Sequence, residues 1–166
     1  MRTASEHGLS LRILDAVEGV NEAQKGLFVA QVFEDLGADL SACNVAVWGL
    51  AFKPDTDDMR EAPSLTVIRG LRGAGATIRV HDPEAQVSAR ALLGESVIFE
   101  DDPYACLKDA DALILLTEWA HYRTPEWPRG VELMRGTRVY DGRNLWDARE
   151  VKGSGLMYAG IGRGRD

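Results

Sequence analysis

Residues 45–64 read VAVWGLAFKPDTDDMREAPS and decide the fold. The four apolar residues 45–48 predict a buried strand, and Gly49 follows it directly. A strand, a glycine-rich loop and a helix are the parts of a dinucleotide-binding unit. Ala51 and Pro54 stand where the second and third glycines of that motif belong. A standard dinucleotide clamp is therefore not expected here.

The same loop offers two cations and an aromatic ring. Lys53 and Arg60 could contact phosphate oxygens, and Phe52 could stack on a base or pack against a sugar. The alternative is a solvated loop in which Arg60 pairs with Asp57 or Asp58. The buried-type residues that lie among these charges favour a binding site.

Acidic residues in this loop raise the question of a divalent cation. Counted from Asp55, Met59 stands where an EF-hand needs an oxygen ligand, Arg60 replaces its glycine, and Thr66 replaces its closing glutamate. Carboxylates before a helix are more simply explained as complements of the helix dipole and as partners of Arg60. We expect no metal site.

Working outward, short apolar runs alternate with amphipathic segments. The expected strands are residues 45–48, 77–80, 97–99, 112–116, 138–140 and 156–159, and the expected helices are residues 63–71, 85–93, 103–108 and 131–134. This alternation predicts βαβ units with a mostly parallel sheet, so the fold class is α/β, Rossmann-like and doubly wound. Ligands bind such sheets at the carboxyl ends of the strands.

The segment before the sheet has helical periodicity. Between Ser10 and Leu36 the apolar residues recur mostly at spacings of three and four, which predicts one long helix. Ser10 can cap its N-terminus, and Gly37 stands where a left-handed C-terminal cap belongs. Gly19 and Gly26 leave open a bend or a break into two helices.

A second cationic loop follows the strand expected at 138–140. Gly142 permits close backbone approach, and Arg143 can form two hydrogen bonds with a phosphate or a carboxylate. A turn in which Arg143 pairs with Asp141 is the alternative. We expect Lys53, Arg60 and Arg143 to converge at one rim of the sheet.

Two more loops follow strands at the same rim. Glu118 or His121 could serve in acid–base chemistry, although the spacing fixes no partner for either. Asp82 stands where Rossmann folds often place an acid for ribose, but it more simply caps the next helix. Cys43 and Cys106 have no histidine beside them in the sequence and are interpreted as structural thiols.

Composition limits the classes of partner. The chain has 166 residues, about one domain, and a net charge of −7, which argues against binding nucleic acid or an anionic membrane surface. The cysteines have no metal-ligand spacing, and nothing near Met1 resembles a secretory leader. We expect a cytoplasmic protein.

Four motifs in this order resemble the C-terminal domain of the UDP-glucose/GDP-mannose dehydrogenase family, and most closely its UDP-glucose 6-dehydrogenases. The motifs are residues 49–64, 81–83, 117–119 and 141–144. Residues 20–25 resemble the family's central helix, which carries much of the dimer contact. The resemblance predicts a connecting and dimerisation helix over residues 1–40 and a nucleotide-sugar-binding domain over residues 41–166, with a homodimer formed through the helix.

The resemblance implies an NAD-dependent oxidation of UDP-glucose to UDP-glucuronate. Phe52, Lys53 and Arg143 resemble residues that bind the UDP-sugar, and Arg60 resembles an arginine that reaches NAD across the domain cleft. The family's GxGxxG motif and its catalytic cysteine have no match here, so no catalytic residue is assigned and the chain alone is expected to be inactive. A dimerisation or scaffold module, or the same role with GDP-mannose or a UDP-N-acetylhexosamine, is the alternative.

Overall fold

The computed structural model describes residues 12–163, so the predicted Ser10 cap lies outside the described residues. The strands are β1 (Asn44–Trp48), β2 (Thr77–His81), β3 (Ile98–Phe99), β4 (Ala112–Leu115), β5 (Arg138–Asp141) and β6 (Met157–Gly160). They form one six-stranded sheet in the order β3-β2-β1-β4-β5-β6, and every pairing is parallel. The strand order reverses between β1 and β4, which confirms the doubly wound Rossmann-like fold.

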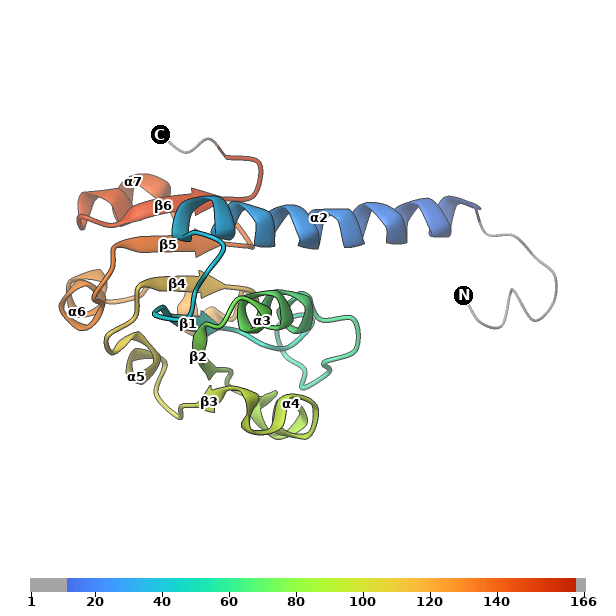
Figure 1. Ribbon diagram of the computed structural model, residues 1–166, viewed down its shortest axis with the longest axis horizontal. Coiled ribbons are helices and arrows are strands. Elements are labelled where there is room, and N and C mark those ends of the chain that lie inside the picture. The colour runs from blue at the N-terminus through green and yellow to red at the C-terminus, as the bar shows by residue number, and fades with distance from the viewer. Residues whose placement is uncertain (1–11, 164–166) are drawn as a thin grey trace.

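Helices lie on both sides of this sheet (Figure 1). They are α2 (Arg12–Leu36), α3 (Pro63–Gly73), α4 (Gln86–Leu93), α5 (Pro103–Leu107), α6 (Trp127–Leu133) and α7 (Ala148–Gly153), with 3-10 turns at Gly94–Ser96 and Ala120–Tyr122. Within residues 12–163, no helix is both long and apolar enough to cross a bilayer.

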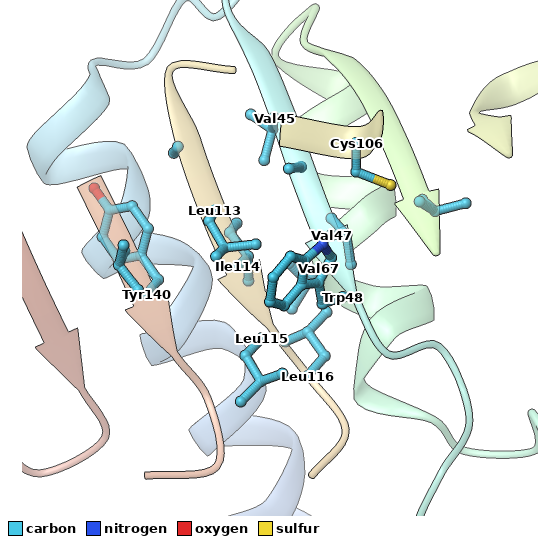
Figure 2. Packing of buried hydrophobic residues seen from close by; sticks show 14 of the residues in the cluster. Val45, Val47, Trp48, Val67, Cys106, Leu113, Ile114, Leu115, Leu116 and Tyr140 are labelled. Carbon is cyan, nitrogen blue, oxygen red and sulfur yellow. The ribbon is translucent and has the colours of Figure 1, made fainter. Parts of the chain in front are cut away.

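The core is centred on β1 and β4, where apolar side chains on both faces of the sheet are buried. Figure 2 shows Val45, Val47 and Trp48 of β1 beside Leu113 and Leu115 of β4. A parallel sheet covered on both faces needs such continuous apolar runs. This burial fixes the positions of the loops that follow the two strands.

Helix α2 runs unbroken through both of its internal glycines. Gly37 ends it at a φ of +94°, and its N–H donates to the carbonyl of Phe33, so the predicted left-handed cap is confirmed. Phe28 and Val32 are buried against the domain, whereas the N-terminal half projects beyond the sheet (Figure 1). The division of the chain at residue 40 stays a prediction.

Two helices differ from the expectation. Helix α6 begins at Trp127 rather than at Val131, because proline is accepted in the first turn of a helix and apolar spacing alone does not show it. Helix α7 was not expected at all. Its sequence is largely polar, and it begins where the Asp147 side chain accepts the N–H of Arg149.

Candidate functional site

The loops after β1, β4 and β5 meet at the carboxyl edge of the sheet, here called the rim. Gly49 begins the first of these loops at a φ of +89°, and a Cβ there would lie 2.5 Å from the backbone nitrogen of Thr117. Thr117 in turn donates its hydroxyl to the carbonyl of Ala51 at 2.6 Å. Only glycine fits this approach, so the first two loops are locked together.

Asp82, which directly follows β2, stabilises the β1 loop through hydrogen bonds. Its side chain is buried, and Oδ2 accepts the N–H groups of Leu50 and Ala51 and the ring N–H of Trp119. Oδ1 accepts the N–H groups of two residues that lead into α4, Glu84 and Ala85. The prediction that Asp82 caps α4 is wrong, because that helix has Ala85 at its N-cap and no side-chain cap hydrogen bond. Asp82 caps the preceding turn instead, and its contacts with the β1 loop were not revealed by the sequence.

These contacts test whether the β1 loop could hold a dinucleotide. A dinucleotide clamp needs free backbone N–H groups at the loop to cradle the pyrophosphate. The N–H groups of Leu50 and Ala51 instead donate to Asp82 at 2.6 and 3.1 Å. The loop does not fit NAD, in agreement with its missing glycines.

Arg143 ties the three rim loops together. Its Nε donates to the carbonyl of Leu116 at 2.7 Å, and its Nη2 donates to the carbonyl of Phe52 at 3.0 Å. Oε2 of Glu118 lies 3.0 Å from the same Nε. The guanidinium is thus fixed by groups after β1 and β4, although Arg143 itself follows β5.

Asp141 supports this loop through the backbone. It is buried, and it accepts the N–H groups of Arg143 and Trp146 and the hydroxyl of Tyr158. Burial and the neighbouring carboxylate raise the pKa of Tyr158. The alternative in which the Arg143 side chain pairs with Asp141 is therefore not what the structure shows.

A pocket of about 410 Å³ lies between α2 and the rim. Phe52 and Arg143 line it from the rim, and Phe28 and Lys25 line it from α2. Gly142 lines it too, and a Cβ there would lie 2.8 Å from the carbonyl of Leu115, so its close approach is to the neighbouring strand. The pocket has apolar walls and a few charged groups, as small-molecule sites do.

Three acidic residues also line this pocket: Glu18, Glu22 and Glu61. They are balanced in part by Lys25, whose Nζ lies 2.6 Å from Oε1 of Glu22, and by Arg143. Cations can bind phosphate, while carboxylates can accept hydrogen bonds from hydroxyl groups. The lining therefore suits a ligand that carries both anionic and hydroxyl groups.

The other two predicted cations lie elsewhere. Arg60 is 89% exposed, and its guanidinium makes a bidentate contact with Asp58, which lowers the pKa of that carboxyl to about 2. It borders a separate groove beside Ser88 of α4. Lys53 is exposed and does not line the pocket of Arg143. The three cations lie on loops of one rim, but only Arg143 lines this pocket, and Asp58 holds Arg60 within its own turn.

Lys25 is a cation of the pocket that was not predicted from the sequence. It stands one helical turn before Phe28, which is buried, so both residues lie on the same face of α2. The side chain of Lys25 is 14% exposed, against 57% for its partner Glu22. The i, i+3 spacing between Lys25 and the buried Phe28 is the sequence feature that could have predicted a lysine on the inner face of α2.

The remaining candidates are the two cysteines and His121. Burial raises the pKa of both thiols, Cys43 and Cys106, which is the opposite of what a nucleophile needs. His121 stacks on His81 with ring centroids 5.9 Å apart, and burial and this second imidazole lower the pKa of His81. Oη of Tyr122 lies 2.7 Å from Nδ1 of His81. These contacts support the rim rather than the pocket.

The comparisons with known proteins agree on one family. Residues 46–148 match the model described as "UDP-glucose/GDP-mannose dehydrogenase family, UDP binding domain". The UDP-glucose 6-dehydrogenase of Pseudomonas aeruginosa is 41% identical over 170 residues, which cover 99% of this chain and 38% of that protein. The enzyme of the same name from Rhizobium meliloti is 36% identical, over 98% of this chain and 37% of that protein.

Solved structures give the same result. A UDP-glucose dehydrogenase from Pyrobaculum islandicum superposes with a TM-score of 0.77 at 38% identity, over 96% of this chain and 34% of that one. A UDP-D-ManNAc dehydrogenase from Pyrococcus horikoshii has a TM-score of 0.76 at 25% identity, over 98% of this chain and 36% of that one. The chain thus spans less than two fifths of the length of the relatives it matches.

Proposed function

The chain belongs to the UDP-glucose/GDP-mannose dehydrogenase family, and we propose that it binds UDP-glucose in the pocket between α2 and the rim. In this proposal it is the nucleotide-sugar-binding portion of an NAD-dependent UDP-glucose 6-dehydrogenase that forms UDP-glucuronate. The observation that carries the proposal is the meeting of Phe52 and Arg143 in one pocket, although they come from different loops.

The chemistry of the lining gives each group a role. The Nε and Nη2 groups of Arg143 donate to carbonyls of the rim. Its Nη1 makes no hydrogen bond with another residue among 12–163, so Nη1 can donate to a diphosphate. Phe52 is 46% exposed, and its ring offers a flat apolar surface to a base or a sugar. Lys25 adds a second cation, and the pocket's carboxylates can accept sugar hydroxyls.

NAD is proposed to bind outside this unit, because the β1 loop does not fit it. When bound, NAD would accept the hydride from the sugar. Arg60 borders a different groove from the UDP-sugar pocket and is highly exposed, which supports its proposed role as a contact for that cofactor. With both thiols unactivated, the chain alone is proposed to be inactive.

A homodimer through α2 is the second part of the proposal. Ile13, Val17, Val20 and Leu27 are 81%, 50%, 68% and 64% exposed, and their spacing places them on one seam of the helix. A second copy that packs against this seam would bury them. The same observation supports the alternative of a dimerisation or scaffold module, and a cytoplasmic location remains a prediction.

Titration calorimetry with UDP-glucose, UDP, GDP-mannose and a UDP-N-acetylhexosamine tests the binding proposal. We expect UDP-glucose to bind, and Arg143→Met to weaken it at least tenfold through the loss of charged hydrogen bonds. Arg149→Met is the matched control, because Arg149 is 93% exposed and contacts only Asp147 in the described structure. Equal affinities for wild type and Arg143→Met would contradict the proposal.

Sedimentation equilibrium separates the two functions. We expect a dimer that Val20→Glu converts to monomer, because two carboxylates would face each other across the seam. A dimer that binds none of the nucleotide sugars would favour the scaffold alternative. A monomer that binds UDP-glucose would leave the binding proposal standing without the dimer.

A further inference from the structure

Each cation of the pocket has a carboxylate beside it, but the two pairs differ in their surroundings. Nζ of Lys25 lies 2.6 Å from Oε1 of Glu22, whose side chain is 57% exposed. Nε of Arg143 lies 3.0 Å from Oε2 of Glu118, and that oxygen is buried. Water does not reach Oε2 of Glu118, although 28% of the Arg143 side chain and 37% of the Glu118 side chain are exposed, so water screens this pair only in part.

Glu118 contacts Arg143 without receiving a hydrogen bond from it. The N–H of Nε is directed to the carbonyl of Leu116, and Nη2 donates to the carbonyl of Phe52. Oε2 of Glu118 has no hydrogen-bond donor among the residues described. A buried carboxylate oxygen without a donor is costly, so charge attraction to the guanidinium keeps it there.

The orientation of Arg143 does not require Glu118. Two backbone carbonyls on two different loops already fix the guanidinium plane, and the loop of Arg143 is held by Asp141 through its backbone. The remaining effect of Glu118 is electrostatic: its negative charge offsets the positive charge that Arg143 presents to the pocket. A second anion that enters beside Arg143 is repelled by this carboxylate.

We propose that Glu118 is an affinity-setting counterion that weakens the binding of every anionic ligand beside Arg143. The inference rests on the proposed function, since it assumes that a nucleoside diphosphate sugar binds at Arg143. Its consequence is that free phosphate and pyrophosphate, which offer charge alone, are held poorly. A UDP-sugar is then retained through the additional contacts of its base and hexose with Phe52 and the pocket walls.

Calorimetry at low ionic strength with pyrophosphate, UDP and uridine tests this inference. Glu118→Gln keeps the shape of the side chain and removes its charge, so we expect pyrophosphate and UDP to bind three- to tenfold more tightly. Uridine, which is uncharged, should bind with unchanged affinity. The gain should disappear in the double variant Glu118→Gln/Arg143→Met.

Glu132→Gln is the matched control. Glu132 is exposed on α6 and does not line the pocket, so this variant makes the same change of net charge at a distance and should alter affinity by less than twofold. Glu118→Ala removes the charge together with the packing and should change affinity in the same direction as Glu118→Gln.

The possible outcomes separate this inference from the proposed function. Weaker or equal binding of pyrophosphate to Glu118→Gln would overturn the counterion role, since weaker binding means that Glu118 orients Arg143 instead. A second outcome is that Glu118→Gln binds pyrophosphate more tightly but binds UDP no more tightly than pyrophosphate. This would support the counterion role of Glu118 and overturn the proposed nucleotide site. If no variant binds either anion, both proposals are wrong.

Discussion

The loop after β1 and the loop after β5 lie at the same rim, and each carries an arginine, yet the two arginines have different surroundings. Arg60 pairs with Asp58, two residues away, and is 89% exposed. Arg143 is held by carbonyls of two other loops and is 28% exposed in the pocket. An arginine that is fixed by distant parts of the chain can present its charge at a defined place, whereas one fixed within its own turn cannot.

Each of the two loops is supported by a buried carboxylate at the end of a strand, Asp82 for the β1 loop and Asp141 for the β5 loop. The two carboxylates differ in the number of hydrogen bonds that they accept. Asp82 accepts five hydrogen bonds, and Asp141 accepts three. The β1 loop is longer and contains two non-glycine residues at positive φ, Asp55 and Glu61, against one, Asn144, in the β5 loop. The longer, more strained loop therefore depends on the more heavily bonded carboxylate.

The largest expected effect is that of Asp82→Asn. In the aspartate, Oδ2 accepts three N–H groups and Oδ1 accepts two. The asparagine has one oxygen, so its amide nitrogen must face the donors of the other position, which are at least two N–H groups. Unsatisfied buried donors cost about 1–3 kcal/mol each, so we expect the free energy of unfolding to fall by about 3–5 kcal/mol. Urea unfolding followed by far-UV circular dichroism measures it.

Asp55→Asn is the control for that variant. Asp55 lies in the β1 loop that Asp82 supports, and it is exposed at a φ of 62°, a conformation that asparagine accepts. The loss of one negative charge there should alter stability by about 0.5 kcal/mol or less. A similar loss in both variants would mean that net charge, and not the hydrogen bonds of Asp82, stabilises the β1 loop.

Asp141→Asn should lower the free energy of unfolding less than Asp82→Asn does. The two variants together test whether the number of accepted hydrogen bonds sets the stability of each loop. The amide oxygen can keep the donors Trp146 and Tyr158, which leaves only the N–H of Arg143 facing an amide nitrogen. We expect a loss of about 1–2 kcal/mol in the same urea experiment. A loss as large as that of Asp82→Asn would show that the number of accepted hydrogen bonds does not set the stability of these loops.

The fold was largely predictable, and the site only in part. Continuous apolar runs such as 112–116 predict buried parallel strands because the interior excludes polar residues, and Gly37 ends α2 as expected. The contacts of Arg143 with Leu116 and Phe52 were not predictable, since they depend on the order β1-β4-β5 in the sheet and join residues 27 and 91 positions apart in sequence. Local charge spacing, by contrast, did include the observed Arg60–Asp58 pair among its alternatives.

Arg60→Gln should have a small effect on folding that depends on pH. The Arg60 guanidinium holds the pKa of Asp58 at about 2, below its ordinary value of 3.8, so the pair stabilises the fold above pH 4 and loses its contribution as the pH falls from about 4 to 2. In Arg60→Gln, we expect a carboxyl-detected NMR titration of Asp58 to move up toward 3.8. An unchanged midpoint would mean that the backbone N–H of residue 60, which also donates to Asp58, lowers the pKa without the charge.

The smallest expected effect is on ligand affinity in the same variant. Arg60 borders a groove near α4 and does not line the pocket of Arg143, and its charge is neutralised by Asp58 and exposed to solvent. Screened charges outside a site change binding little, so Arg60→Gln should bind UDP within twofold of wild type, whereas Arg143→Met loses at least tenfold. Calorimetry of the two variants side by side makes the comparison. Equal losses would mean that the β1 loop moves when UDP binds and brings Arg60 to the ligand, so that the two arginines act as one site.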